Sequence, residues 1–272
     1  MQRSMQLPIY QADAFTSELF KGNPAAYVPL TRWLDDRLMQ QIAAENNLAE
    51  TAFTVPSGNG FELRWFTPGE EVPLCGHATL VTAHLLWTEL GFTDDEIHFF
   101  TRSGELIVRR KGELLALDFP AQVNQPVGLG QEYTDALGAA PLSAMEVAGS
   151  DDQLLVELAS AEAVASLDPD MRAVANLPYK GVICTAPGEG FDCDFVSRFF
   201  APAIGIDEDP VTGSAHTRLV PFWADRLDKT ALRAKQISPR GGELDCELRG
   251  KRVIMRGKAV TYLRGQISLK EK

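Results

Sequence analysis

The sequence predicts an α/β (α+β) fold made of two similar halves, each a mixed β-sheet packed around one apolar helix. Three observations predict this fold. A six-residue motif occurs twice, as PLCGHA at residues 73–78 and as PVTGSA at residues 210–215. A largely apolar segment of helical length follows each copy, and β-rich segments lie before and after both. Self-similarity of this kind is typical of a duplicated structural unit, so we interpret the chain as a duplicated half.

The duplication extends beyond the motif. An arginine, an aromatic pair and a proline lead into each copy, and an acid lies two residues before each motif proline. The matching pairs are residues 64–68 with 198–202, Glu71 with Glu208, and residues 102–106 with 240–244, at offsets that drift from 134 to 138 residues. These offsets favour halves at residues 1–119 and 120–272, and they leave open whether the C-terminal strand packs back on the first half.

Composition excludes one class of partner. The chain has 272 residues, of which 45% are hydrophobic, and this is enough for a packed core in each half. The net charge is −11, whereas a nucleic-acid partner requires a basic footprint, so we expect no nucleic-acid binding. A small anionic substrate remains compatible, because it needs only local positive potential.

Targeting and metal-binding patterns are not evident. The N-terminal residues form no apolar signal core, and no apolar run is long enough to span a bilayer. We therefore expect a cytoplasmic protein without a membrane partner. The four cysteines form no C-x-x-C pair, and their spacing indicates neither a disulfide framework nor a zinc site. Reduced thiols and no metal are the expectation.

Hydrophobic periodicity and breaker residues place the elements. We expect helices at residues 34–46, 76–90 and 213–227, the last bent at Pro221. A further helix should start at residues 168–170, with Pro169 in its first position. Residues 123–130 look like a linker between the halves. Expected strands cover residues 7–15, 25–28, 51–55, 61–66, 97–101, 106–110, 114–119, 154–158, 181–185, 195–200, 234–238, 244–248, 252–255 and 259–263.

Each motif puts glycine and small residues where a strand turns into a helix. Free backbone N–H groups and the positive end of the helix dipole point out of such a turn, so it can hold a carboxylate or an oxyanion. If the halves face each other across a pseudo-twofold axis, two helix N-termini converge on one cleft and hold a short carboxylate substrate. The alternative is that both motifs are only tight strand–helix connections.

Differences between the two motif copies reduce the number of possible reaction mechanisms. Cys75 in the first copy corresponds to Thr212 in the second. A symmetric two-thiol racemase needs a cysteine in both copies, so two-thiol epimerisation is not expected. Considered by itself, Cys75 is better explained as a small packing residue than as a nucleophile. The remaining acid–base candidates are Glu50, His77 and Asp209.

Each candidate has a structural alternative. Glu50 enters a β-rich segment in a mostly apolar setting, where a carboxyl can act as base and then as acid, although most glutamates are surface residues. His77 is equally compatible with a capping or core histidine. Asp209 precedes a proline and a glycine turn, and this pattern also suits an N-terminal helix cap.

Several segments together resemble the phenazine-biosynthesis (PhzF-like) family of isomerases, which is related in fold to diaminopimelate epimerase and proline racemase. They span nearly the whole chain in the family's order. The segments are DAFT at 13–16 with GNPA at 22–25, LAETAF at 48–53, FTP at 66–68 with EVPLCGHAT at 71–79, and FAP at 200–202 with EDPVTGSAH at 208–216.

The resemblance implies the diaminopimelate epimerase-like fold: two pseudo-symmetric halves, each a curved mixed β-sheet wrapped around a central α-helix, with the site between them. It also implies no cofactor, no metal and a homodimer. Glu50 would be the proton-shuttling acid/base of such an enzyme. The residues that would bind its substrate are Gly76, His77, Asp209, Gly213 and Ser214.

Three functions follow from these observations. The first is a cofactor-independent isomerase of a small carboxylate-bearing substrate, with Glu50 removing and returning a proton. The second is a one-thiol epimerase or racemase with Cys75 and Glu50 on opposite faces of the substrate carbon. Cys75 departs from the phenazine enzyme at this position, so the phenazine substrate is not carried over, and Cys75 stays open as a secondary acid or base. The third is a non-catalytic binding protein on the same scaffold.

Overall fold

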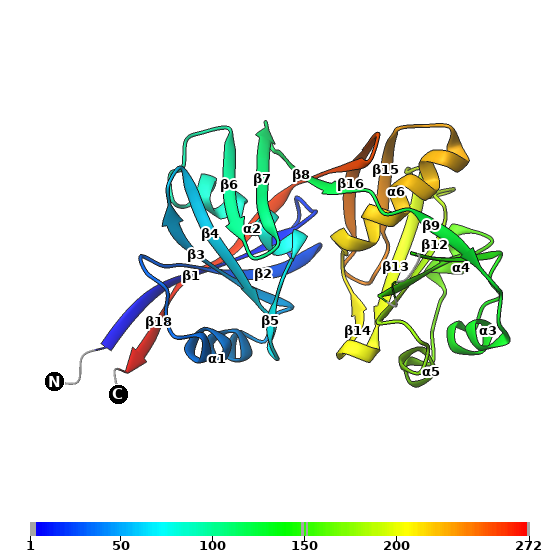
Figure 1. Ribbon diagram of the computed structural model, residues 1–272, viewed down its shortest axis with the longest axis horizontal. Helices are drawn as coiled ribbons and strands as arrows, with labels where there is room; N and C mark the ends of the chain where they lie inside the picture. The colour runs from blue at the N-terminus through cyan, green and yellow to red at the C-terminus, as the bar shows by residue number, and fades with distance from the viewer. Residues whose placement is uncertain (1–3, 148–149, 151, 271–272) are drawn as a thin grey trace. The chain divides into compact units, whose positions relative to one another are not determined.

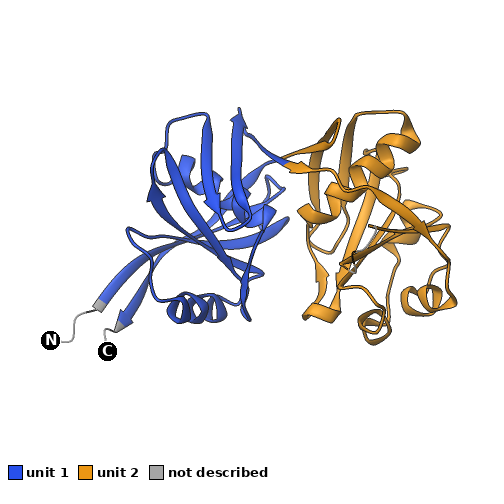
Figure 2. Ribbon diagram, viewed as in Figure 1, with its two compact units in different colours: residues 1–118, 257–272 blue, residues 119–256 orange. Residues whose placement is uncertain are grey.

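The computed structural model describes residues 4–147, 150 and 152–270, and the chain divides into two compact units (Figures 1 and 2). Unit 1 comprises Met1–Asp118 and Gly257–Lys272, and unit 2 comprises Phe119–Arg256. Each unit combines a mixed sheet with a few helices, so the predicted mixed α/β class is confirmed. Within the described residues, no helix is both long enough and apolar enough to cross a membrane.

The C-terminal strand belongs to unit 1, although the expected second half, 120–272, includes it. Strand β18 (Ala259–Lys270) pairs antiparallel with β1 (Ser4–Ala14), from Ser4 opposite Lys270 to Ala14 opposite Ala259. Figure 1 shows the two strands side by side. This ladder returns the last 16 residues, Gly257–Lys272, to the first unit.

The rest of the unit 1 sheet is built outward from β1. Strand β2 pairs antiparallel with β1, β3 runs parallel to β2, and β4 returns antiparallel to β3. Strand β6 is parallel to β4, and β7 and β8 follow as antiparallel neighbours, while the short β5 pairs with β4. Their bounds are β2 (Asn23–Pro29), β3 (Glu50–Ser57), β4 (Gly60–Phe66), β5 (Glu71–Val72), β6 (Glu96–Thr101), β7 (Gly104–Lys111) and β8 (Leu114–Pro120).

Helix α1 (Asp36–Asn46) covers part of this sheet. It begins two residues later than expected, because the Asp35 carboxylate accepts a hydrogen bond from the Arg37 N–H and caps the helix. Its buried face contains Met39 and Ile42, which belong to a core cluster with Phe53 of β3.

Helix α2 (Gly76–Thr88) is the buried helix of unit 1. Nine of its thirteen residues are buried, and it packs against β1, β2, β3 and β18. Thr79 and Thr82 can be buried in this helix because each hydroxyl donates a hydrogen bond to the carbonyl four residues earlier. The polar groups therefore need no water. The helix begins at the expected residue and ends two residues before the expected Leu90.

Unit 2 repeats the plan with additional elements. Strands β11 and β12 are parallel, as are β13 and β15, and the other neighbouring strands are antiparallel. Helix α6 spans the expected range and packs against β11, β15 and β16. The bounds are β9 (Asn124–Val127), α3 (Gln131–Leu137), β10 (Ser143–Val147), β11 (Gln153–Glu157), α4 (Ala161–Ala165), α5 (Met171–Ala175), β12 (Gly181–Pro187), β13 (Phe195–Ala201), η1 (Pro202–Ile204), β14 (Ile206–Asp209), α6 (Gly213–Leu227), β15 (Ala231–Gln236), β16 (Gly242–Arg249) and β17 (Arg252–Gly257).

Two expectations for unit 2 are wrong. The expected linker at 123–130 contains strand β9, which pairs with β10 and is held by a hydrogen bond from the Arg218 side chain to Asn124 Oδ1. The helix expected to start with Pro169 in its first position instead begins at Met171, because the Asp170 carboxylate accepts from the N–H groups of Arg172 and Ala173.

The duplication appears as the same contacts in both units. Arg64 donates two hydrogen bonds to Glu71, at 2.7 and 2.7 Å, and Arg198 donates two to Glu208, at 2.7 and 2.8 Å. Each guanidinium also lies over the phenylalanine two residues later, with centroid distances of 5.2 and 4.8 Å. Both pairs are mostly buried, and each one fixes the chain just before its motif.

A serine hydroxyl donates a hydrogen bond to the proline carbonyl of each motif. The Ser103 hydroxyl donates to the Pro73 carbonyl at 2.8 Å, and the Ser238 hydroxyl donates to the Pro210 carbonyl at 2.9 Å. The two motif turns are therefore held from both sides by equivalent groups.

We expect Glu208→Ala to lower the free energy of unfolding by about 3 kcal/mol, because it leaves the Arg198 guanidinium buried without its carboxylate. Urea denaturation followed by circular dichroism measures this change. The matched control is Asp152→Ala, which breaks an ion pair whose side chains are 58% and 63% exposed and should cost less than about 1 kcal/mol. Equal losses in the two variants would contradict a structural role for the repeated pair.

Candidate functional site

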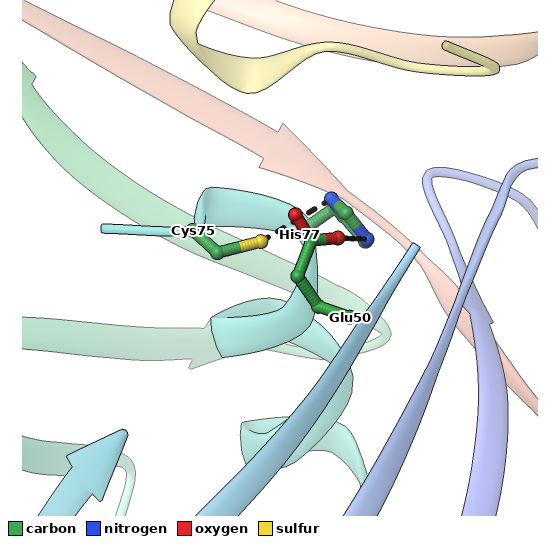
Figure 3. A group of neighbouring side chains, drawn as sticks. All are labelled: Glu50, Cys75 and His77. Atoms are coloured by element: carbon green, nitrogen blue, oxygen red, sulfur yellow. Dashed lines mark hydrogen bonds and ion pairs between the residues drawn. The ribbon is translucent and has the colours of Figure 1, made fainter. Parts of the chain in front are cut away.

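Three side chains of unit 1 meet at the start of α2 (Figure 3). The His77 imidazole contacts both of the others, with Nε2 3.1 Å from Glu50 Oε2 and Nδ1 3.5 Å from Cys75 Sγ. Cys75 and His77 are buried, and the Glu50 side chain is 14% exposed. The structure thus brings together three of the residues that the sequence singled out.

Two backbone elements position this trio. Glu50 is the first residue of β3, where it pairs with Ala25 of the parallel strand β2. Cys75 is the N-cap residue of α2 in an extended conformation, and His77 lies in the first helical turn. The chain turns from strand to helix at Gly76, so the helix start faces the beginning of β3.

Opposing effects set the charge of His77. Burial by itself lowers its pKa, but the neighbouring Cys75 and Glu50 outweigh burial and raise the pKa well above the usual value. Burial and the nearby Glu50 carboxylate raise the pKa of the Cys75 thiol above its usual value. The Glu50–His77 contact is an ion pair by distance, although its two atoms are not aligned as a hydrogen bond.

The first turn of α2 has no side-chain cap. Cys75 makes no capping hydrogen bond, and no acid lies in the first turn. The positive end of the helix dipole is therefore not compensated by a carboxylate within the helix itself, and its first N–H groups can serve an anion. Helix α6 shares both features at Thr212.

The second motif is fixed by a network in unit 2. The Thr212 hydroxyl donates to the Asp209 carboxylate, and the Thr212 N–H donates to Gln236 Oε1 at 2.8 Å. Gln236 Nε2 in turn donates to the Asp209 carbonyl at 2.7 Å. The N-cap residue is Thr212, so the alternative in which Asp209 is the helix cap is wrong.

Gln236 was missed by the sequence reasoning. It is 1% exposed and lies at the end of β15, where Leu232 and Ala234 also face the interior. This alternation of buried residues places Gln236 inside, and a buried amide requires polar partners. The alternation was therefore the signal that could have found it.

Ser214 and the two glycines complete the set of predicted residues. Ser214 is exposed in the first turn of α6, and its hydroxyl accepts a hydrogen bond of 3.1 Å from Gln153 Nε2. Gly76 and Gly213 are the first residues of α2 and α6. Asp209, Gly213 and Ser214 thus lie together in unit 2, and Glu50, Gly76 and His77 lie together in unit 1.

The trio is also the only group of described residues whose geometry suits a metal ion. The ligand atoms of Glu50, Cys75 and His77 lie within 4.8 Å of one another, and all three residue types bind zinc. Metal binding would require a thiolate and a neutral imidazole, so an ion would have to displace the protons of Cys75 and His77.

Residues 12–265 match the family described as phenazine biosynthesis-like protein. The chain belongs to this PhzF-like family. The resemblance drawn from the motifs is thus confirmed. An uncharacterized isomerase of Pseudomonas aeruginosa is 54% identical over 97% of this chain and all of its own length. A second, from Halalkalibacterium halodurans, is 45% identical over 97% of this chain and all of its own length.

Solved structures show the same relationship. A PhzF-family protein of Enterococcus faecalis superposes with a TM-score of 0.92 at 46% identity, covering 97% of this PhzF-like chain and 99% of that one. A hydroxyproline epimerase of Agrobacterium vitis superposes with a TM-score of 0.64 at 10% identity, covering 100% of this chain and 95% of that one. The latter shows a shared fold alone. With full-length relatives named isomerases, the prediction of an isomerase-class enzyme is confirmed.

We expect the His77 pKa to fall in Glu50→Gln, because the neutral amide removes one of the charges that raise it. Titration of the imidazole resonances by NMR measures this shift. His216 is the control: burial lowers its pKa to about 4, and among the described residues its hydrogen-bond partner is the Thr212 carbonyl, so its resonance should not respond to the variant. An unchanged His77 pKa would contradict the ion pair.

The raised pKa of His77 also predicts how the free energy of unfolding changes with pH. A group whose pKa is raised by folding stabilises the protein fully below its unfolded pKa of about 6.5, and this contribution is lost as the pH rises through the folded value. The free energy of unfolding should therefore fall above neutral pH in the wild type, and less so in Glu50→Gln.

Proposed function

We propose that this PhzF-like protein isomerises a small carboxylate-bearing substrate without a cofactor, with Glu50 as the group that transfers the proton. The observation that supports this most is the ion pair of Glu50 with His77 at the uncapped start of α2. This arrangement places a carboxylate base next to the cation that orients it. It also places free N–H groups of the helix nearby, where they can stabilise developing negative charge.

The proposed steps use only these groups. One oxygen of the Glu50 carboxylate faces His77, which leaves the other oxygen to remove a proton from a carbon next to the substrate's carbonyl or carboxylate. The electron pair of the broken C–H bond moves onto the substrate oxygen, where the N–H groups of the first turn of α2 stabilise it. The protonated Glu50 then returns the proton to another carbon, and the enzyme regains its starting state.

The second motif has a binding role in this proposal. The first turn of α6 is free of acids and side-chain caps, and Ser214 is exposed there. Because Gln153 donates to its oxygen, the Ser214 hydroxyl proton is free to donate to a substrate oxygen. Asp209 accepts from Thr212 and would hold a polar substituent of the substrate.

We expect Glu50→Gln to stop proton exchange, lowering the rate by at least about 100-fold, because the amide keeps the shape of the side chain but cannot act as a base. Incorporation of solvent deuterium into a panel of small hydroxy, amino and unsaturated carboxylates, read by mass spectrometry, measures it. Glu45→Gln is the control, since Glu45 is an exposed acid on α1. Exchange that continues in Glu50→Gln would overturn the assignment. Absence of both solvent exchange and isomer formation in the wild type would favour a non-catalytic binding protein.

The one-thiol epimerase remains the second candidate, because Cys75 contacts His77 within the same trio. Burial raises the pKa of this thiol, which disfavours it as a base at neutral pH. Cys75→Ser should therefore retain most of the exchange activity. If exchange at the substrate carbon were lost in Cys75→Ser while circular dichroism showed an intact fold, the one-thiol mechanism would replace the one proposed here.

We expect Ser214→Ala to raise KM by about tenfold with a smaller change in kcat, because it removes one hydrogen bond to a charged substrate group. Steady-state kinetics on the substrate found in the deuterium screen separates the two constants. Thr217→Ala is a control on the next turn, since Thr217 is buried and its hydroxyl donates to the Ser214 carbonyl. A selective loss in kcat would instead place Ser214 in the chemical step.

A further inference from the structure

Unit 1 contains a hollow away from the Glu50–Cys75–His77 trio. Its volume is about 380 Å³, within the range of small-molecule sites. The C-terminal half of α2 forms one wall with His84 and Trp87, and the β7–β8 hairpin forms another with Arg110 and Leu115. Lys258, which directly precedes β18, and Val260 of β18 also line the hollow. The trio lies at the opposite end of α2, so the hollow is a separate feature.

Two cations lie at this hollow, and one is weakly held. Lys258 Nζ contacts Glu113 Oε2 at 2.7 Å, but the two side chains are 43% and 81% exposed. An ion pair this exposed is screened by solvent and weak, so an incoming carboxylate can replace Glu113. Arg110 is fixed differently, with its guanidinium over the Trp87 ring at 5.3 Å and Nη2 donating to the Thr93 carbonyl.

His84 has one ring nitrogen, Nδ1, that can accept a hydrogen bond from a ligand. Glu89 is ionised, because paired hydrogen bonds from Arg264 lower its pKa, and it can only accept. The Thr261 hydroxyl therefore donates its one proton to Glu89 and must accept from His84 Nε2, 3.0 Å away. Burial lowers the pKa of His84, so the ring is neutral and Nδ1 carries a lone pair. No hydrogen bond among the described residues uses this Nδ1.

We propose that this hollow binds a second small molecule: an organic anion with a carboxylate for Lys258, a hydrogen-bond donor for His84 Nδ1, and an apolar body between them. The apolar body packs against Trp87, Leu115 and Val260. The Trp87 wall is rigid, because its Nε1 donates to the Asp94 carbonyl at 2.7 Å. The ligand chemistry thus follows from one displaceable cation, one unused acceptor and an apolar wall.

Isothermal titration calorimetry with three probes at millimolar concentrations tests the site. The probes are 3-hydroxybenzoate, benzoate and 3-hydroxybenzyl alcohol, which differ in the hydroxyl donor and in the carboxylate. We expect 3-hydroxybenzoate to bind most tightly. Lys258→Met should weaken it by up to about fivefold, to the level of the alcohol. Glu113→Gln should strengthen it by up to about fivefold, because the competing carboxylate is removed.

Matched controls make the outcome decisive. Lys229→Met removes a comparable lysine, 54% exposed and paired with Asp194 in unit 2, and should leave binding unchanged. His84→Phe should remove the preference for 3-hydroxybenzoate over benzoate, with circular dichroism showing that the fold is intact. No binding of any probe to the wild type would overturn the proposal, as would equal losses in Lys258→Met and Lys229→Met. Glu50→Gln should bind the probes normally, so failure here is separate from failure of the proposed isomerase.

Discussion

The start of a buried helix is the constraint on which each unit depends. A helix surrounded by its sheet leaves its first N–H groups without intrahelical partners, and these must be satisfied or used. In both units the chain reaches that start through a turn held by a bidentate Arg–Glu pair in front and a serine hydroxyl behind. Neither helix then supplies a side-chain cap. The scaffold thus holds the turn rigidly while leaving the helix end open to a ligand.

The two copies of this turn have different chemistry. The first carries Cys75 and His77 beside Glu50, a trio that can move a proton. The second carries Thr212 and Asp209, which are locked by the buried amide of Gln236. We infer that duplication supplied two equivalent anion-binding turns, and that divergence assigned proton transfer to one of them.

Much of the fold could be predicted, since repeats and periodicity are local patterns. The range of α6 and the first residue of α2 follow from the motif glycine that begins each helix and the apolar residues that follow it. Strand β9 and helix α3 could not be recognised in this way. Strand β9 is four residues long and contains a proline, and it is held by β10 and by the Arg218 side chain, which is 94 residues away in sequence. Such partners exist only after the chain has folded.

The sequence by itself determined the duplicated motif and, through the resemblance of its motifs, the family. The same motifs supplied the candidates Glu50, Cys75, Gly76, His77, Asp209, Gly213 and Ser214. Only the tertiary structure decided which of them touch. The ion pair of Glu50 with His77 joins a strand to a helix 27 residues later, and the order of acid, imidazole and thiol depends on how β3 lies against α2. The C-terminal strand likewise belongs to unit 1 because its backbone groups pair with β1, a choice that no local pattern encodes.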